Sequence, residues 1–246
     1  MHPSALQIGQ KVVELYWKIK AKRILDIGSR DVNGSLRSFC PAGAEYTGVD
    51  LEAGRGVDVV LKDAYDYPFP DEYFDLIVST SCFEHDGMFW LAFLEQLRVL
   101  SKSGTMYINA PSNGAYHGYP YDNWRFYPDA ALALEAWARR NGQEVFVIES
   151  FIGPQIEAGW NDCVMIFQKT APPSLDQRRA FEFFPGSYNI RKFGHQGIIN
   201  FASHPQDEQM IGALTAKVKE LTALVERLRQ GERSQRQAVA ADQGVI

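Results

Sequence analysis

The chain has 246 residues, of which 46% are hydrophobic, 13% aromatic and 22% charged. This composition is that of a globular protein with one sizeable core and an appendage, and it excludes a disordered or fibrous chain. The 25 Lys and Arg residues against 30 Asp and Glu residues give a net charge of -5. No global basic field therefore attracts phosphates, and nucleic acid is not expected as the main partner.

Cysteine usage and hydropathy indicate the compartment. Cys40, Cys82 and Cys163 are an odd number of cysteines at wide spacings without a C-x-x-C. This excludes a disulfide framework and a zinc-finger ligand set, and it fits a reducing compartment. Residues 1–22 lack the apolar core of a signal peptide, and no run of about 18 apolar residues occurs. We therefore expect a cytoplasmic protein without a membrane span.

The apolar pattern changes along the chain from a helical to a strand-like period. Between residues 5 and 19 it predicts one leading helix. Helical stripes at 88–100 and 128–140 predict two more helices, the second opened by Pro128 and closed by Asn141-Gly142. Strands alternating with helices predict a mainly parallel α/β sheet. Seven short apolar runs predict its strands, at residues 23–27, 46–49, 57–61, 74–78, 105–109, 145–149 and 163–168.

The C-terminal third is organised differently. Residues 171–206 show no clear period and are predicted to form an irregular extension of a domain spanning 1–170. Residues 207–230 are predicted to form a coiled-coil helix, because apolar residues alternate at spacings of three and four with β-branched residues at a and leucine at d. This stripe predicts a homodimer through residues 211–228, although it could instead pack onto its own body. Residues 231–246 are predicted to be disordered.

The first predicted strand ends in a small, polar turn that contains Asp26, Gly28 and Ser29. In open α/β sheets ligands bind at the carboxyl ends of strands, and glycine lets the backbone approach them closely. The second strand ends at Asp50, which follows Gly28 at close to the roughly 20-residue spacing of an acid that binds ribose hydroxyls. The pair predicts a nucleoside-bearing cofactor.

Charge near this turn discriminates between cofactors. A dinucleotide places its pyrophosphate at a helix N-terminus, where Asp26 and Asp31 would repel it. The spacing from Gly28 to Gly34 also fails the G-x-G-x-x-G signature of nicotinamide dinucleotide sites. S-adenosylmethionine carries a ribose, an ammonium group and a sulfonium but no phosphate, and it therefore fits the turn.

In these features the sequence resembles the class I S-adenosylmethionine-dependent methyltransferases over residues 22–169. Residues 24–28 match the start of the family's glycine-rich motif, residues 62–64 its adenine-contacting strand end, and residues 74–78 and 81–85 its fourth strand and following turn. Arg30 departs from the pattern, because the family usually has a second glycine there. The resemblance implies a Rossmann-like seven-stranded sheet with helices on both faces, and S-adenosylmethionine bound by Asp26, Gly28, Ser29, Asp50, Leu51, Asp63, Ala64 and Ser81.

The turn after the fourth strand lacks the Asn/Asp-Pro-Pro-Tyr/Phe that similar enzymes use on planar nitrogen, so an oxygen acceptor is expected. A hydroxyl has to lose its proton, and histidine is the commonest base. His85 and His117 are the candidate catalytic residues. Alternatively, Glu84 and His85 simply cap the helix that begins near Gly87. His117 and Asp122 lack a spacing diagnostic of a metal site, so no metal is predicted.

The segment 111–127 combines aromatic and charged side chains and is predicted to bind the acceptor. Its aromatics could instead form a structural lid packed on the core. The segment resembles that of bacterial methyltransferases associated with cell-surface glycan synthesis, which implies a small-molecule or glycan acceptor. The predicted substrate-binding residues are Tyr116, Asp122, Trp124 and Arg125.

Two functions of other classes stay open beside O-methylation. One is a nicotinamide-dependent reductase, which predicts dinucleotide binding. The other is a non-catalytic scaffold that keeps the cofactor fold and works through its C-terminal coil.

Overall fold

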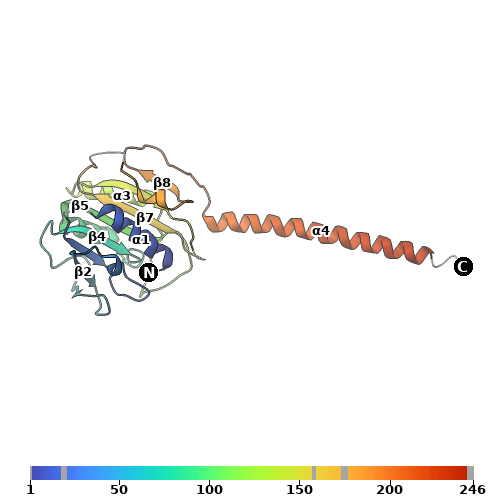
Figure 1. Cartoon of the computed structure of the whole chain (residues 1–246), viewed down its shortest axis with the longest axis horizontal. Coiled ribbons are helices and arrows are strands. Elements are labelled where there is room, and N and C mark those ends of the chain that lie inside the picture. Colours follow the sequence, from blue (N-terminus) through green and yellow to red (C-terminus); the bar gives the residue numbers. More distant parts are fainter. Residues whose placement is uncertain (1, 18–20, 157–158, 173–176, 243–246) are drawn as a thin grey trace. The chain divides into compact units, whose positions relative to one another are not determined.

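The computed structural model describes residues 2–17, 21–156, 159–172 and 177–242. The chain divides into two compact units, Met1–Ala202 and Ser203–Ile246. The first unit is an α/β body built on one sheet, and the second contains the helix α4 (Figure 1).

Eight strands in the described part of the chain form the sheet, in the order β3-β2-β1-β4-β5-β7-β6-β8. Strands β3, β2, β1, β4 and β5 run parallel, whereas β7, β6 and β8 join the sheet antiparallel. The strands are β1 (Arg23–Ile27), β2 (Glu45–Asp50), β3 (Val59–Val60), β4 (Phe74–Thr80), β5 (Leu100–Pro111), β6 (Phe146–Ile152), β7 (Asp162–Gln168) and β8 (Tyr188–Lys192).

Both faces of the sheet are covered, as the α/β prediction required. Leu25 of β1 belongs to a core cluster that includes side chains of α2 (Phe89–Val99) and α3 (Asp129–Arg140). The adjacent Ile24 belongs to the opposite cluster, which includes α1 (Pro3–Tyr16) and the short 3-10 helices η1 (Leu36–Phe39) and η2 (Ala180–Phe183). The near-continuous burial of β1 and β4 follows from this double cover.

All seven predicted strands are present, but the sheet has an eighth strand, so the predicted number of seven is wrong. The eighth strand, β8, lies in the segment 171–206 that was expected to be irregular, and it pairs with β6. Its sequence reads Tyr-Asn-Ile-Arg-Lys, and Ile190 is its one buried residue. An edge strand with a single buried position gives too little apolar pattern to be detected. The body consequently extends beyond the predicted boundary at residue 170 to Ala202.

The predicted helices of the body are confirmed with small differences. Pro128 is the N-cap of α3 rather than its first helical residue. The leading helix ends at Tyr16, because Trp17 is already extended, and the remainder of its predicted range, 18–19, lies outside the described residues.

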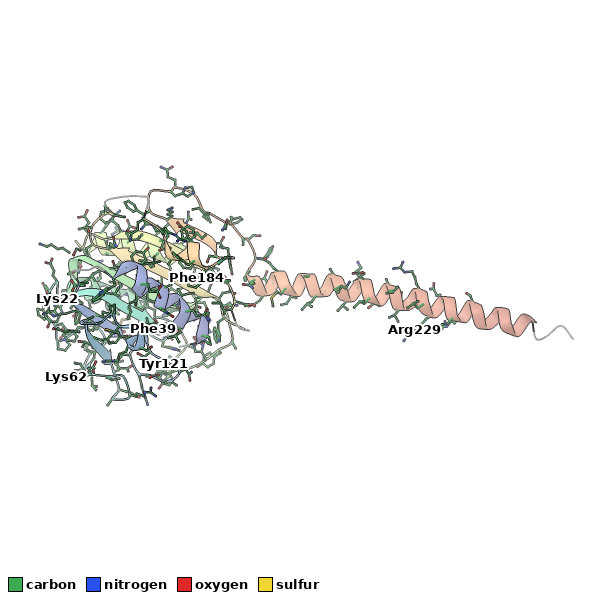
Figure 2. All side chains as sticks on the ribbon, viewed as in Figure 1. Lys22, Phe39, Lys62, Tyr121, Phe184 and Arg229 are labelled. Atoms are coloured by element: carbon green, nitrogen blue, oxygen red, sulfur yellow. The ribbon has the colours of Figure 1, made fainter. Side chains whose placement is uncertain are left out.

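The second unit differs more from its prediction. Helix α4 (Gln206–Asp242) is one continuous helix that runs past residue 230, so the expected disorder of 231–246 is wrong for residues 231–242. Residues 243–246 lie outside the described residues. The stripe predicted for a coiled coil lies in the part of α4 whose side chains Figure 2 draws, and it is solvent-exposed in the single chain. No helix in the described ranges is long and apolar enough to cross a bilayer.

Candidate functional site

The turn after β1 is held against two neighbouring strand ends. Gly28 adopts a left-handed conformation with φ +73°, and a Cβ there would lie 2.9 Å from both Cβ and Sγ of Cys82 in the turn after β4. The N–H groups of Gly28 and Ser29 both donate to Val49 O of β2, at 3.0 Å each. Glycine is required here by conformation and by contact. The turn lies at the carboxyl edge of the parallel strands, where ligands bind in such folds.

Two acidic strand ends lie along the same edge. Asp50 accepts hydrogen bonds from the N–H of Arg30 at 3.3 Å and of Glu52 at 3.1 Å. A carboxylate offers about four acceptor sites, so acceptor capacity remains for a ligand. Leu51 beside it is 56% exposed and offers an apolar surface. In the next strand end, Asp63 is exposed and accepts from the N–H of Tyr65 at 2.8 Å, and Ala64 is half-buried.

Two predicted cofactor residues lie inside the protein. Asp26 is 4% exposed and accepts a hydrogen bond from the Tyr46 hydroxyl at 2.7 Å. Burial raises the pKa of Asp26 to about 7, although the hydrogen bond from Tyr46 opposes the shift. The Ser29 side chain is buried against Gly48, where an added Cβ would lie 2.6 Å from its Oγ. Their sequence positions did not reveal this inward orientation.

The edge fits S-adenosylmethionine better than a phosphate-bearing cofactor. The absence of a Cβ at Gly28 lets this turn pack directly against Cys82 at the carboxyl edge of the sheet. The cations of the loop are already paired, Arg30 with Glu52 and Arg55 with Asp31. These pairs leave little positive charge for a pyrophosphate. Ser81, at the end of β4, is half-buried with φ +53°, and its N–H donates to Asn109 O at 2.9 Å.

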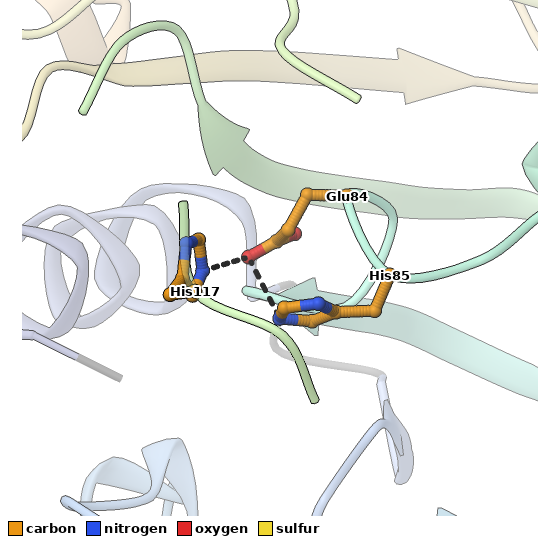
Figure 3. Close-up of side chains that lie close together, drawn as sticks. All are labelled: Glu84, His85 and His117. Carbon is orange, nitrogen blue, oxygen red and sulfur yellow. Dashed lines mark ion pairs between the residues drawn. The ribbon is translucent and has the colours of Figure 1, made fainter. Parts of the chain in front are cut away.

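The candidate histidines meet at a buried carboxylate (Figure 3). Nε2 of His85 lies 3.6 Å and Nε2 of His117 lies 3.8 Å from the same Oε1 of Glu84. The Glu84 side chain is 1% exposed, and neither of its oxygens has a hydrogen-bond partner among the described residues. Sequence reasoning identified both histidines but not Glu84 as the group between them. The available signal was the Glu-His pair that follows β4.

The segment 111–127 is fastened to the turn that carries Glu84. The N–H groups of Asn123 and Trp124 donate to Glu84 O, at 2.7 and 3.1 Å. The Asn123 side chain donates to His85 O at 2.9 Å, and the Trp124 indole donates to Asp86 O at 2.8 Å. These bonds bring His117 to His85, with ring centroids 5.0 Å apart. Two stretches distant in sequence therefore form one site.

The four predicted acceptor-binding residues occupy different environments. The Trp124 ring lies edge-on to Phe89, with centroids 5.5 Å apart, as the structural-lid alternative expects. Arg125 forms a bidentate pair with Asp122, which holds the pKa of Asp122 below its usual range. Tyr116, by contrast, is 77% exposed.

His117 is biased toward its charged form. Glu84 is the main cause that raises its pKa above the ordinary value, and Asp122 adds to the effect. Asp122 also accepts a hydrogen bond from the His117 N–H at 2.8 Å, which fixes the backbone at this position.

Comparison with known proteins identifies the class of this edge. Residues 25–108 match the family described as a methyltransferase domain. A fatty-acid O-methyltransferase of Mycolicibacterium smegmatis (strain ATCC 700084 / mc(2)155) is 31% identical over 100 residues, a match that covers 35% of this chain and 36% of that protein. The match thus spans about a third of the relative's length.

The fold is similar to that of a solved methyltransferase. The structure of the Burkholderia thailandensis 1,6-didemethyltoxoflavin-N1-methyltransferase, with bound 1,6-didemethyltoxoflavin and S-adenosylhomocysteine, superposes with a TM-score of 0.51 at 17% identity. The superposition covers 68% of this chain and 79% of the solved chain. Residues 25–108 therefore match a methyltransferase domain, and the chain has the fold of a solved methyltransferase. The matched segment contains Gly28, Asp50 and Glu84, whereas His117 lies beyond it.

Proposed function

We propose that the protein transfers a methyl group from S-adenosylmethionine to an oxygen atom of a small-molecule or glycan acceptor. The observation that carries this proposal is the contact between the cofactor turn and the turn after β4, which also carries Glu84 and His85. Gly28 lies against Cys82, only two residues before Glu84. Groups that can manage an acceptor proton thus lie beside the turn that approaches the cofactor.

For the cofactor, we assign ribose binding to Asp50 and adenine contacts to Leu51, Asp63 and Ala64. The backbone of Gly28 allows close approach, and Ser81 borders the site at the end of β4. The buried Asp26 and Ser29 shape the turn from inside, where Asp26 joins β1 to Tyr46 of β2. S-adenosylmethionine would supply an electrophilic methyl carbon on its sulfonium, which a deprotonated oxygen can attack while the thioether sulfur leaves with the electrons of the carbon–sulfur bond.

The acceptor proton is assigned to the histidine cluster. Nδ1 of His85 lies 2.5 Å from Tyr121 O, so Nδ1 carries the hydrogen and the Nε2 lone pair faces the site. His117 also directs Nε2 toward Glu84. Either imidazole can accept the proton of a hydroxyl as a general base, with Glu84 stabilising the resulting imidazolium.

An oxygen acceptor is supported by the similarity to the fatty-acid O-methyltransferase of Mycolicibacterium smegmatis and by the missing Asn/Asp-Pro-Pro-Tyr/Phe turn. A glycan acceptor is supported by the resemblance of segment 111–127 to methyltransferases of cell-surface glycan synthesis. Exposed rings in this segment, those of Tyr116, Tyr119 and Tyr121, offer apolar faces for a sugar or another ring. Asp122, Trp124 and Arg125 hold the segment in place.

Self-association is proposed through residues 211–228 of α4. The six stripe residues are 44% to 65% exposed, and their a and d identities favour a parallel two-stranded coil. Leu221→Glu should convert a dimer to a monomer in sedimentation velocity, whereas Ala223→Glu, at an outward heptad position, should not. A wild-type chain that sediments as a monomer contradicts the proposal.

The three free thiols support a reducing, cytoplasmic compartment.

Calorimetric titration of the full chain with S-adenosylmethionine, S-adenosylhomocysteine and NADH tests the function first. Micromolar binding of the two adenosyl ligands alone is expected, followed by acceptor screening that begins with sugars. Binding of NADH alone would establish the reductase instead. Absence of binding by all three ligands would favour the non-catalytic scaffold.

A further inference from the structure

The tautomers of the two histidines are determined by their outward contacts. Nδ1 of His85 faces a backbone carbonyl, which can only accept a hydrogen bond. Nδ1 of His117 lies 3.4 Å from Ala115 O and 3.4 Å from Asp122 Oδ2, again two acceptors. The hydrogen of the neutral His85 ring therefore lies on Nδ1, and the two acceptors near Nδ1 of His117 favour the same tautomer there. Both Nε2 lone pairs face the Glu84 carboxylate.

Three electron-rich atoms directed at one another are stabilised by a cation between them, which is either a proton on one imidazole or a metal ion. An unpaired buried carboxylate is costly, and Glu84 has no hydrogen-bond donor among the described residues. A proton on one imidazole would be shared over 3.6 or 3.8 Å, beyond the 2.7 to 3.2 Å of an ordinary hydrogen bond. Two ligands bound tetrahedrally to one ion at about 2.1 Å lie about 3.4 Å apart. The observed separations of 3.6 and 3.8 Å are closer to the distance between two ligands of one ion than to the length of a hydrogen bond.

We propose that Glu84, His85 and His117 bind one divalent transition-metal ion through a carboxylate oxygen and the two Nε2 atoms. Their three ligand atoms lie within 4.8 Å of one another (Figure 3). An ion equidistant from Oε1 and the two Nε2 atoms sits at most about 2.5 Å from each, so closure to 2.0–2.2 Å needs shifts of a few tenths of an ångström. No metal site was predicted from the sequence, because the third ligand, His117, comes from a different loop.

The ligand set selects the class of metal. Two imidazoles and one carboxylate suit zinc, manganese, iron(II) or cobalt, whereas magnesium and calcium prefer all-oxygen sites. The acceptors of the Nδ1 hydrogens, Tyr121 O for His85 and Ala115 O with Asp122 for His117, are the orienting partners that metal-bound histidines usually have. Three protein ligands leave at least one coordination position open.

The open position defines a role that rests on the proposed methyl transfer. A hydroxyl oxygen bound there loses its proton to water more readily, because the ion lowers its pKa. The oxygen then forms its bond to the methyl carbon as the carbon–sulfur bond of the sulfonium breaks and the sulfur keeps the electron pair. In this arrangement the histidines act as ligands and not as bases.

Metal titration of the tag-free, chelator-treated full chain tests the site. One Zn²⁺, Mn²⁺ or Co²⁺ per chain is expected by calorimetry, with Co²⁺ giving visible absorption bands, and Mg²⁺ should bind much more weakly. No binding of the first three ions overturns the proposal, and equal binding of Mg²⁺ overturns the assignment to transition metals.

Variants locate the ion. Glu84→Gln, which keeps the side-chain shape, and His117→Ala, in a half-exposed loop position, should each weaken Zn²⁺ binding at least about 10-fold. His85→Ala should do the same. His195→Ala removes an exposed histidine outside the cluster and should bind like the wild type. Unchanged affinity in all three cluster variants places the ion elsewhere and overturns the proposal.

Titration of the metal-free chain with S-adenosylhomocysteine separates this proposal from the methyltransferase function. Adenosyl binding without ion binding leaves the function standing and removes the metal site, whereas the converse leaves only the metal site. Turnover should fall in chelator and return with Zn²⁺, Mn²⁺ or Co²⁺. Turnover indifferent to chelator would restore the histidines as bases and overturn the role of the ion.

Discussion

The two halves of the site are built by different means. The cofactor half, around Gly28 and Asp50, consists of strand ends joined by main-chain hydrogen bonds, such as those from Gly28 and Ser29 to Val49 O. The proposed acceptor half consists of side chains from two distant turns, where Glu84 and His85 meet His117. Main-chain architecture tolerates most side-chain changes, whereas a converging cluster depends on each member. Substitutions should therefore affect the two halves differently.

Gly28→Val should have the largest effect, with S-adenosylhomocysteine binding lost beyond detection. The valine is strained at φ +73° and its Cβ collides with Cys82. Calorimetry gives the affinity, and circular dichroism reports folding. Gly43→Val is the matched control, because Gly43 has φ +82° but no atom within 4 Å of an added Cβ. Equal loss of binding in both variants would mean that strain alone, and not contact at the edge, is responsible.

His117→Ala should lower turnover about 100-fold or more and leave S-adenosylhomocysteine affinity unchanged, because the side chain belongs only to the acceptor half. The expected effect is the same whether the imidazole acts as a base or as a ligand. His195→Ala serves as the control, and turnover with the acceptor found by screening is the measurement. Loss of cofactor affinity in the His117 variant would contradict the division into two halves.

Asp26→Asn tests the buried part of the cofactor half through pH. Since the pKa of Asp26 is raised to about 7, the folded chain holds a proton that the unfolded chain releases near pH 4. Wild-type stability should therefore fall as pH rises from about 4 through 7, and the asparagine removes this loss. The variant should gain about 3 kcal/mol relative to wild type between pH 5 and 8 in urea unfolding.

Tyr46→Phe provides the opposite change. The phenylalanine removes the hydrogen bond that favours the charged form of Asp26, so the pKa of Asp26 should rise further. The fall in the stability of this variant with rising pH should therefore continue to a higher pH than in the wild type. A pH-independent difference between Asp26→Asn and wild type would show that the Asp26 carboxyl group does not titrate in this range.

Asp50→Ala should have the smallest effect, weakening S-adenosylhomocysteine binding about 10- to 30-fold, the worth of one hydrogen bond to a charged group. Glu52→Ala is its control, because Glu52 is an exposed acid two residues away that pairs with Arg30. Equal losses in the two variants would indicate a general effect of negative charge at this edge. That result would contradict the assignment of a specific ribose contact to Asp50.

Local pattern was sufficient for much of the fold. The runs that became β1, β4 and β7 are apolar because they are covered on both faces, and that burial is visible in sequence. Strand β8 could not be predicted, since an edge strand with only Ile190 buried carries no strong period. The extension of α4 beyond residue 230 was missed because a polar tail rich in helix formers has the composition of a disordered one.

The sequence by itself indicated where the cofactor edge lies, because Gly28, Asp50 and Asp63 stand at or just after strand ends and parallel strands bring their carboxyl ends together. The methyltransferase class was implied by the resemblance of these motifs to that family. Only the tertiary structure decided that Asp26 turns inward to Tyr46 and that Glu84 joins His85 to His117. Contacts between neighbours in a sheet follow from a repeating period that a sequence displays. Convergence of side chains from two loops follows from the path of the chain, which no local pattern encodes.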